Sequence, residues 1–353
     1  MTADTTDTGA PTAAEPTRDA GGAVVASRAP FFIVGSDRSG TTMLRLILDR
    51  ASAGPAVPPE TMFITDFLPA LRSGKLGDHA AAADFTKRVW NHPRVQLWEL
   101  EGEPQTPPEG LSHEDAFRWG IEQPFIAYML RHGKTWWADK TPPHIDHIEY
   151  LLEIFPDAKF VELVRDGRDV ALSIMGLPFG GNNPYATGKR WASCVRKGAE
   201  ARAEMPDRVV LVRYEDLVTQ PEPEVRRVSE FLGIPYEDDM LHVEKTDITK
   251  LQKDQQQWFS NLWAGINQTA MGKWRTKMSE HDQRLYLAAA GDELALHGYD
   301  LGGLEPLDVN PAYAAALATT NFGTRLVNLV KLRIVKEHGR ELGWVIKRRL
   351  RRN

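Results

Sequence analysis

The segment Phe31–Leu44, which reads Phe-Phe-Ile-Val-Gly-Ser-Asp-Arg-Ser-Gly-Thr-Thr-Met-Leu, limits the fold of this chain more than any other. It opens with a short apolar run that suits a buried parallel strand. Gly35 and Gly40 then bound a loop, and backbone N–H groups of such a loop, with the dipole of a following helix, bind phosphate. The helix is predicted because apolar residues recur on one face, at Leu44, Ile47, Leu48 and Ala51. We therefore expect an α/β fold with a central parallel sheet.

The spacing of the glycines is close to that of an ATP- or GTP-hydrolase loop, but the decisive residues differ. Thr41 stands where such a loop carries lysine, and Arg38 lies inside the loop instead. Two further expected strands, 159–164 and 208–212, run into arginine rather than into a magnesium-binding aspartate. A P-loop kinase, which needs that lysine and a carboxylate for magnesium, is the alternative enzyme class and predicts binding of ATP with magnesium.

The loop residues Arg38, Ser39, Gly40, Thr41 and Thr42 resemble the 5′-phosphosulfate loop of the sulfotransferases. The resemblance implies a three-layer α/β/α fold with a P-loop-like central parallel sheet and helical insertions. It also implies 3′-phosphoadenosine-5′-phosphosulfate (PAPS) as the donor and no metal. The motif pattern is most similar to the tyrosylprotein-type and bacterial branches of the family.

A second segment is similar to the one that holds the donor's 3′-phosphate in this family. Arg165 follows an expected strand and Ser173 comes eight residues later, within an expected helix. An arginine fork and a hydroxyl can grip one phosphate together. In the alternative interpretation, Arg165 and Arg168 pair with Asp166 and Asp169 on a solvated helix start.

Two shorter motifs complete the expected nucleotide site. Met271–Arg275 resembles the late Gly-x-Trp-Lys element of the family, which makes Lys273 the phosphate ligand, with Arg275 as its alternate, and places Trp274 in packing or stacking near the base. Tyr214 lies in a Tyr-Glu-x-Leu pattern whose tyrosine is near the nucleotide in the family. The alternative for the basic-aromatic cluster is an exposed helix start.

The resemblance also suggests the catalytic groups. Arg38 and Lys140 would stabilise charge on the transferred group and on the bridging oxygen, and Glu60 would be the general base, as a glutamate is in the tyrosylprotein branch. Pro142 occupies the position of the histidine base of the cytosolic branch, and His144 and His147 are interpreted as residues of a polar helix face rather than as catalysts. The alternatives are a surface lysine at 140 and an ordinary helix N-terminal carboxylate at 60.

Composition along the chain divides it into a disordered tail (1–28), a sulfotransferase domain (29–310) and a C-terminal tail (311–353). Insertions at 67–133 and 176–206 are expected to form the acceptor region, although their tryptophans could equally serve helix packing. The acceptor itself is expected to be a hydroxyl on a sugar, lipid, natural product or tyrosine.

Residues 325–353 hold ten Lys or Arg against two Glu, with apolar residues at helical spacing. The pattern predicts peripheral contact with an anionic membrane surface. A docked C-terminal helix and an oligomer contact are the alternatives.

The net charge of −5 argues against nucleic acid as a partner, and a single cysteine excludes an internal disulfide. The absence of apolar runs of about 20 residues and of a signal-peptide pattern predicts a cytoplasmic enzyme, peripheral at the inner membrane face if the tail binds lipid. A non-catalytic nucleotide- or membrane-binding protein that retains the fold is the alternative from another class.

Overall fold

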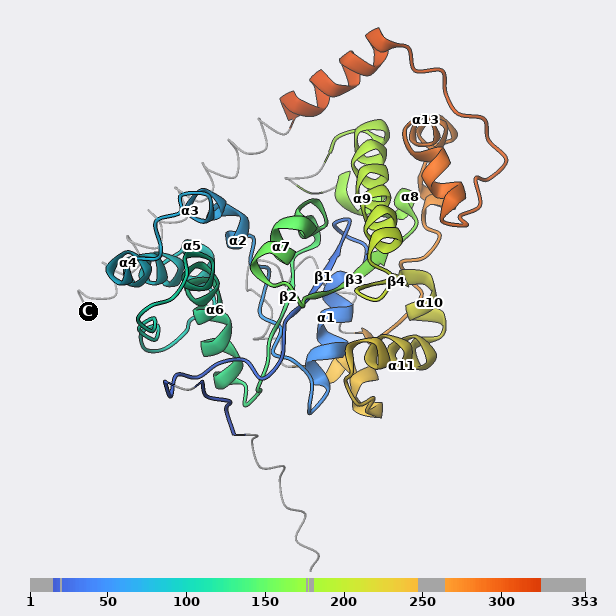
Figure 1. The fold of residues 1–353 in the computed structure, drawn as a ribbon. Coiled ribbons are helices and arrows are strands. Elements are labelled where there is room, and N and C mark those ends of the chain that lie inside the picture. Colours follow the sequence, from blue (N-terminus) through green and yellow to red (C-terminus); the bar gives the residue numbers. More distant parts are fainter. Residues whose placement is uncertain (1–14, 20, 176, 178–180, 247–263, 325–353) are drawn as a thin grey trace, which may run out of the picture. The chain divides into compact units, whose positions relative to one another are not determined.

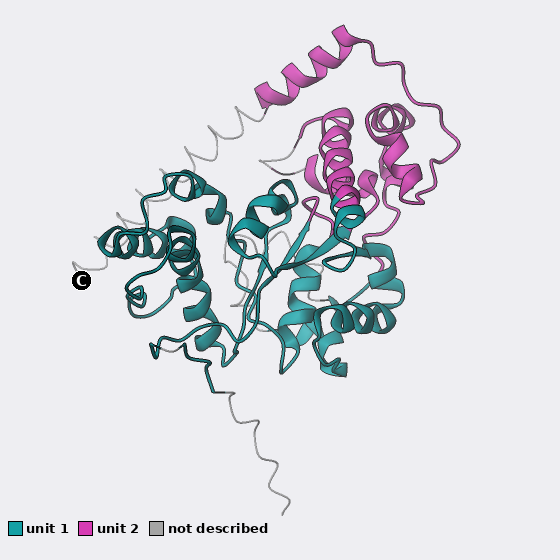
Figure 2. Cartoon of the chain, in the orientation of Figure 1, with its two compact units in different colours: residues 1–34, 41–163, 201–267 teal, residues 35–40, 164–200, 268–353 magenta. Residues whose placement is uncertain are grey.

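The computed structural model describes residues 15–19, 21–175, 177, 181–246 and 264–324. The chain forms two compact units (Figure 2). Unit 1 comprises Met1–Val34, Thr41–Leu163 and Ala201–Asn267, and unit 2 comprises Gly35–Gly40, Val164–Glu200 and Gln268–Asn353. The glycine loop therefore belongs to unit 2, whereas the strand before it and the helix after it belong mainly to unit 1.

The central sheet confirms the expected α/β class. It contains β1 (Phe31–Gly35), β2 (Ala138–Lys140), β3 (Lys159–Val164) and β4 (Val209–Arg213), in the order β2-β1-β3-β4, and is parallel. The register between β1 and β2 pairs Phe31 with Ala138 and Ile33 with Lys140. The strand that follows β1 in the chain, β2, lies on one side of β1, and β3 lies on the other side. The strand order therefore reverses between β1 and β3, and ligands of such sheets bind at the carboxyl ends of the two strands that flank a reversal.

Helices cover both faces of the sheet. Right-handed connections between parallel strands place their helices on opposite faces of the sheet when they run in opposite directions along it. Accordingly, α1 (Thr41–Arg50) lies on one face and α7 (Ile148–Ile154) on the other (Figure 1). On one face Phe32 stacks on Phe160, with ring centroids 5.6 Å apart. Such packing of apolar side chains fixes the strands that lead into the loops.

The rest of unit 1, where the structure describes it, is largely helical, and the tryptophans between β1 and β2 pack in its interior. The helices between β1 and β2 are α2 (Phe63–Asp66), α3 (Leu68–Leu71), α4 (His79–Trp90), α5 (Pro93–Gln96) and α6 (His113–Arg131). Later come η1 (Pro142–His147), α10 (Tyr214–Thr219), α11 (Pro221–Leu232), η2 (Asp238–Leu241) and η3 (Val243–Lys245). Trp90, Trp98 and Trp119 are buried, which favours helix packing for the tryptophans of the 67–133 insertion.

Unit 2 is built from α8 (Gly167–Met175), α9 (Pro184–Glu204), α12 (Trp274–Lys277), α13 (Glu280–Leu296) and a helical stretch at 311–324. Gly167 is required at the start of α8, since a Cβ there would come within 2.0 Å of the Tyr286 hydroxyl and 2.6 Å of the Trp191 ring. The basic segment 325–353 lies outside the described residues. Among those that are described, no helix is long and apolar enough to span a membrane.

Residues 21–28 lie within the segment predicted to be disordered, but they are tied to unit 1. The Val24 N–H donates to Gln105 Oε1 at 2.8 Å, and the Ser27 N–H donates to the Thr135 carbonyl at 2.7 Å. Arg28 donates to the Leu232 carbonyl at 2.8 Å. The composition of this segment, low in large apolar residues, gave no sign of these backbone contacts.

Candidate active site

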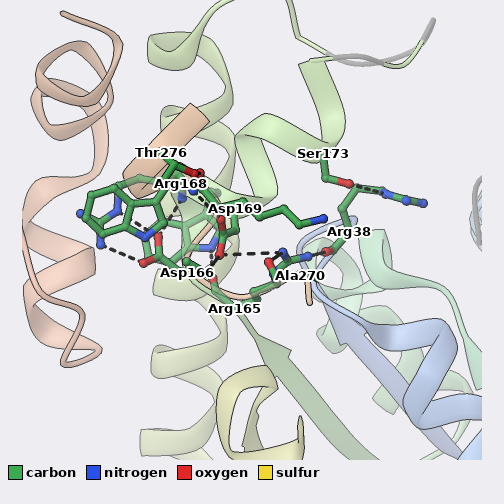
Figure 3. Close-up of polar contacts among 12 residues, drawn as sticks. Arg38, Arg165, Asp166, Arg168, Asp169, Ser173, Ala270 and Thr276 are labelled. Atoms are coloured by element: carbon green, nitrogen blue, oxygen red, sulfur yellow. Dashed lines mark hydrogen bonds and ion pairs between the residues drawn. The ribbon is translucent and has the colours of Figure 1, made fainter. Parts of the chain in front are cut away.

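The glycine loop of unit 2 holds an arginine in an unusual conformation. Arg38 has a φ of 67°, in the left-handed region that favours glycine, and such strain is typically retained at functional sites. Its Nε donates to Ser173 Oγ at 3.1 Å, so that the loop arginine and the helix serine predicted for the site are in contact (Figure 3). Ser39 is fully buried, and its hydroxyl has no hydrogen-bond partner among the described residues.

Arg165, directly after β3, is buried and bonded to carbonyl groups. One amino group donates to the Arg38 carbonyl at 3.2 Å and the other to the Ala270 carbonyl (Figure 3). The Trp191 indole N–H donates to the carbonyl of Arg165 itself, at 3.0 Å. The segment is therefore not a solvated helix start, and Arg165 joins the glycine loop to the segment around residue 270.

Arg168 pairs with Asp166, as one alternative predicted, but both side chains are buried. The Arg168 guanidinium also lies over the Trp274 ring, 3.4 Å from its centroid, and Arg275 lies 4.4 Å from the same centroid. Trp274 is thus packed between cationic side chains in unit 2. Of the two roles predicted for this tryptophan, packing is the one that these contacts support.

The Lys273 backbone is held by its neighbours. Asp169 Oδ2 accepts the Gly272 N–H at 2.7 Å, and Asp169 Oδ1 accepts the Trp274 N–H at 2.9 Å. Burial raises the pKa of Asp169, and the opposing effects of Arg165 and of these N–H bonds do not fully cancel it. The Lys273 ammonium has no hydrogen bond or ion pair with any part of the chain that the structure describes.

Unit 1 brings together Lys140 and Glu60. Lys140 Nζ lies 2.6 Å from Glu60 Oε1 and 3.2 Å from Thr42 Oγ1, and its side chain is buried. The alternative of a surface lysine is therefore wrong. Burial by itself would raise the pKa of Glu60, but the charge and hydrogen bond of Lys140, with Arg94 and Arg45 nearby, lower it below its ordinary value.

Residues that the sequence reasoning missed hold the Glu60 segment in place. Arg45 Nε donates to the Val57 carbonyl at 2.7 Å, and Asp49 Oδ1 accepts the Val57 N–H at 3.2 Å. The Thr61 N–H donates to Thr141 Oγ1 at 3.0 Å. A signal for Arg45 and Asp49 was available, because both interrupt the otherwise apolar run of α1.

Thr141 belongs to a buried polar network behind Lys140. Its hydroxyl donates to Asp139 Oδ1 at 3.1 Å, and Asp139 Oδ2 lies 2.9 Å from His144 Nδ1. His144 does not lie on the exposed polar face that the sequence predicted, since its side chain is buried. The network fixes the segment that carries Lys140 relative to the one that carries Glu60.

Tyr214 is buried at the first turn of α10, directly after β4. The structure places it in unit 1. Among the described residues, no group of three or more His, Cys, Asp or Glu side chains could hold a metal ion.

Comparison with known proteins identifies the family. The model of the sulfotransferase family matches residues 30–238, more than half of the chain, and the chain belongs to this family. Protein-tyrosine sulfotransferase 1 of Danio rerio is 27% identical over 286 residues, which cover 76% of this chain and 72% of that protein.

A bacterial relative and a solved structure are also similar. The omega-hydroxy-beta-dihydromenaquinone-9 sulfotransferase Stf3 of Mycobacterium bovis is 27% identical over 244 residues, covering 58% of this chain and 63% of that protein. The sulfotransferase domain of the olefin synthase of Synechococcus PCC 7002 is 21% identical, with a TM-score of 0.49, covering 78% of this chain and 97% of that domain. The match to Stf3 spans less than two thirds of the length of that mycobacterial protein.

Proposed function

We propose that the protein transfers a sulfuryl group from PAPS to a hydroxyl acceptor and releases adenosine 3′,5′-bisphosphate. The observation that carries this proposal is the arrangement in unit 2, where Arg165 contacts the backbone of Arg38 and Arg38 contacts Ser173. Family membership supports sulfuryl transfer in general. A loop that has an arginine but no P-loop lysine supports PAPS rather than ATP as the donor.

Arg165, Ser173 and Lys273 are the proposed ligands of the donor's 3′-phosphate. A guanidinium fork and a hydroxyl suit a phosphate, and Lys273 brings a positive charge that no described residue neutralises. Tyr214 is a candidate neighbour of the nucleotide through the family resemblance alone.

The loop amides of Ser39, Gly40, Thr41 and Thr42 are proposed to bind the 5′-phosphosulfate. These residues form the end of the glycine loop and the start of α1, where N–H groups without intrahelical partners favour an anion. The buried hydroxyl of Ser39, which lacks a partner among the described residues, is a further donor for such an anion.

Charge stabilisation accounts for Arg38 and Lys140. In sulfuryl transfer the acceptor oxygen attacks sulfur in line with the bridging oxygen, which gains negative charge as its bond to sulfur breaks. By analogy with phosphoryl transfer, the enzyme contributes mainly positioning and positive charge. Arg38 would contact the transferred group, and Lys140 the bridging oxygen.

Glu60 is the proposed base for the acceptor hydroxyl, but its ion pair with Lys140 weakens it in the free protein. A carboxylate whose pKa is lowered by a neighbouring ammonium is a poor proton acceptor. An anionic donor competes for Lys140, and Glu60 becomes more basic once Lys140 turns to the donor. Glu60 Oε2 has no hydrogen bond to the described residues and can take the proton.

The acceptor class is proposed as a hydroxyl on a protein tyrosine, a lipid, a sugar or a natural product. The two relatives represent two of these acceptor classes, since one is a protein-tyrosine sulfotransferase and the other a sulfotransferase of a hydroxylated menaquinone. The two relatives are equally identical to this chain, so neither name favours one acceptor over the other.

Thermal-shift measurements with nucleotides test the proposal. Adenosine 3′,5′-bisphosphate should raise the melting temperature in the presence of EDTA, whereas ATP with magnesium should have little effect. The opposite result would favour a P-loop kinase. Binding of the bisphosphate without transfer of labelled sulfate to any hydroxyl acceptor class would favour a non-catalytic protein.

A further inference from the structure

The segment from Ala270 to Trp274 is held at alternate residues by the segment that follows β3. Arg165 donates to the Ala270 carbonyl (Figure 3). Asp169 accepts the Gly272 and Trp274 N–H groups, and Arg168 lies over the Trp274 ring. All of these residues belong to unit 2. The family resemblance accounts for Arg165 and Lys273 but assigns no role to Asp169.

We propose that Asp169 is a positioning residue for donor binding, which holds the two amides that flank Lys273 and so fixes this lysine for the donor's 3′-phosphate. The inference rests on the proposed PAPS-dependent function. Both oxygens of the Asp169 carboxylate are occupied by these amides. Asp169 acts through Lys273 and need not touch the donor.

The charge of Asp169 is balanced by its surroundings, which explains how this aspartate can lie near the proposed 3′-phosphate site. The Asp169 carboxylate is buried, accepts the two N–H bonds and has Arg165 Nη2 at 3.8 Å. Charge-assisted bonds from backbone amides satisfy the carboxylate, which limits its repulsion of a phosphate. Lys273, in contrast, forms no ion pair with any described residue.

Conformational entropy explains why a held turn matters. A lysine on a loose turn loses backbone freedom when it binds a ligand, and that loss weakens binding. Gly272 has a φ of 65°, and a Cβ on it would meet no atom within 4 Å. Gly272→Ala therefore strains the turn through its backbone angle alone, without a clash and without any change of charge.

Calorimetric titration of the full chain with adenosine 3′,5′-bisphosphate and with adenosine 5′-monophosphate tests the proposal. Asp169→Asn keeps the size of the side chain but replaces one acceptor by a donor. We expect it to weaken bisphosphate binding about tenfold, because preorganisation of a charged contact is lost, and to leave monophosphate binding unchanged. Lys273→Met should give a loss of the same kind.

The double variant Asp169→Asn/Lys273→Met gives the most specific result. If Asp169 acts through Lys273, the double variant loses no more affinity than Lys273→Met alone, because residues that act through one contact are not additive. Asp300→Asn is the control. Asp300 is exposed and pairs with Arg275, the residue after Trp274, and removal of its charge should leave the affinities for both nucleotides unchanged. Additive losses, or an equal loss for the monophosphate, would overturn the inference.

Hydrogen exchange separates this inference from the proposed function. The amides of residues 272 and 274 should exchange faster in Asp169→Asn while the exchange of α13 is unchanged. If Asp169→Asn does not fold, Gly272→Ala must show the same selective loss of bisphosphate affinity, and an unchanged affinity would overturn the inference. A wild-type chain that does not bind the bisphosphate would overturn the proposed function and, with it, the role of Asp169 in binding.

Discussion

The candidate cations of the two units are held in opposite ways. In unit 2, Arg165 donates to two carbonyl oxygens and has the Asp169 carboxylate at 3.8 Å, and Lys273 has no described partner. In unit 1, Lys140 is buried against the carboxylate of Glu60 at 2.6 Å. Carbonyl oxygens hold a cation in position without neutralising its charge, whereas a carboxylate holds the cation and also neutralises it. Lys273 in unit 2 therefore presents charge that an anion can use at once, and Lys140 in unit 1 presents charge that becomes available only when its ion pair opens.

The largest expected effect comes from breaking the unit 1 pair. Lys140→Met should lower the transfer rate by about 10²–10³-fold, since it removes a charge that stabilises the leaving oxygen. It should also lower the free energy of unfolding by about 2 kcal/mol, less than for a fully buried pair because the Glu60 side chain is 23% exposed. Labelled-sulfate transfer and urea unfolding measure the two effects.

A second substitution separates these effects. Lys140→Met/Glu60→Gln removes the unpaired carboxylate, so it should recover most of the lost stability but none of the lost activity. Recovery of activity in the double variant would show that Lys140 serves only to neutralise Glu60.

In unit 2, a smaller effect is expected from Arg165→Lys. Lysine keeps the positive charge but lacks the fork that reaches two carbonyls, so affinity for adenosine 3′,5′-bisphosphate should fall about tenfold, with little change in the rate at saturating donor. Arg196→Lys, a change at an exposed side chain in the same unit, is the matched control. Equal losses of bisphosphate affinity in the two variants would contradict a specific role for Arg165 in binding.

The pH dependence of stability should have opposite signs in the two units. The pKa of Glu60 is lowered from 4.5, so Glu60 adds stability above that value that is lost as the pH falls through its folded pKa. The pKa of Asp169 is raised from 3.8, so its contribution is full below that value and is lost as the pH rises through its folded pKa.

Unfolding across this pH range tests both signs. The stability difference between the wild type and Glu60→Gln should shrink as the solution is acidified below 4.5. The difference between the wild type and Asp169→Asn should shrink as the pH rises above 3.8. Two differences that change in the same direction would contradict the contrast between the units.

The smallest effect is expected from the C-terminal tail, whose removal should not affect the cations of either unit. The full chain should sediment with liposomes that contain anionic lipid, and a chain that ends near residue 311 should not, because the ten basic residues of 325–353 are then absent. Equal sedimentation of the two chains would end the membrane prediction.

Local patterns in the sequence were enough to predict the sheet and the cations. The apolar runs before Gly35 and Arg165 are strands. Arg38 and Ser173, which the family resemblance assigned to one donor site, are in contact across 135 residues. The Glu60–Lys140 pair could not be derived from local patterns, because 80 residues separate its members and only the register of β1 with β2 sets the strand end that carries Lys140. The Asp169 contacts depend in the same way on a segment more than 100 residues later in the chain.

Binding of adenosine 3′,5′-bisphosphate in EDTA, compared with adenosine 5′-monophosphate and with ATP and magnesium, is the most direct test of a metal-independent donor site in unit 2. Calorimetry should give affinity for the bisphosphate that is at least about 100-fold higher than for the monophosphate, or about 2.7 kcal/mol. This preference should fall in Arg165→Lys. Equal affinity for the two adenosine nucleotides, or tighter binding of ATP with magnesium, would contradict the assignment of the unit 2 cations to the 3′-phosphate of PAPS.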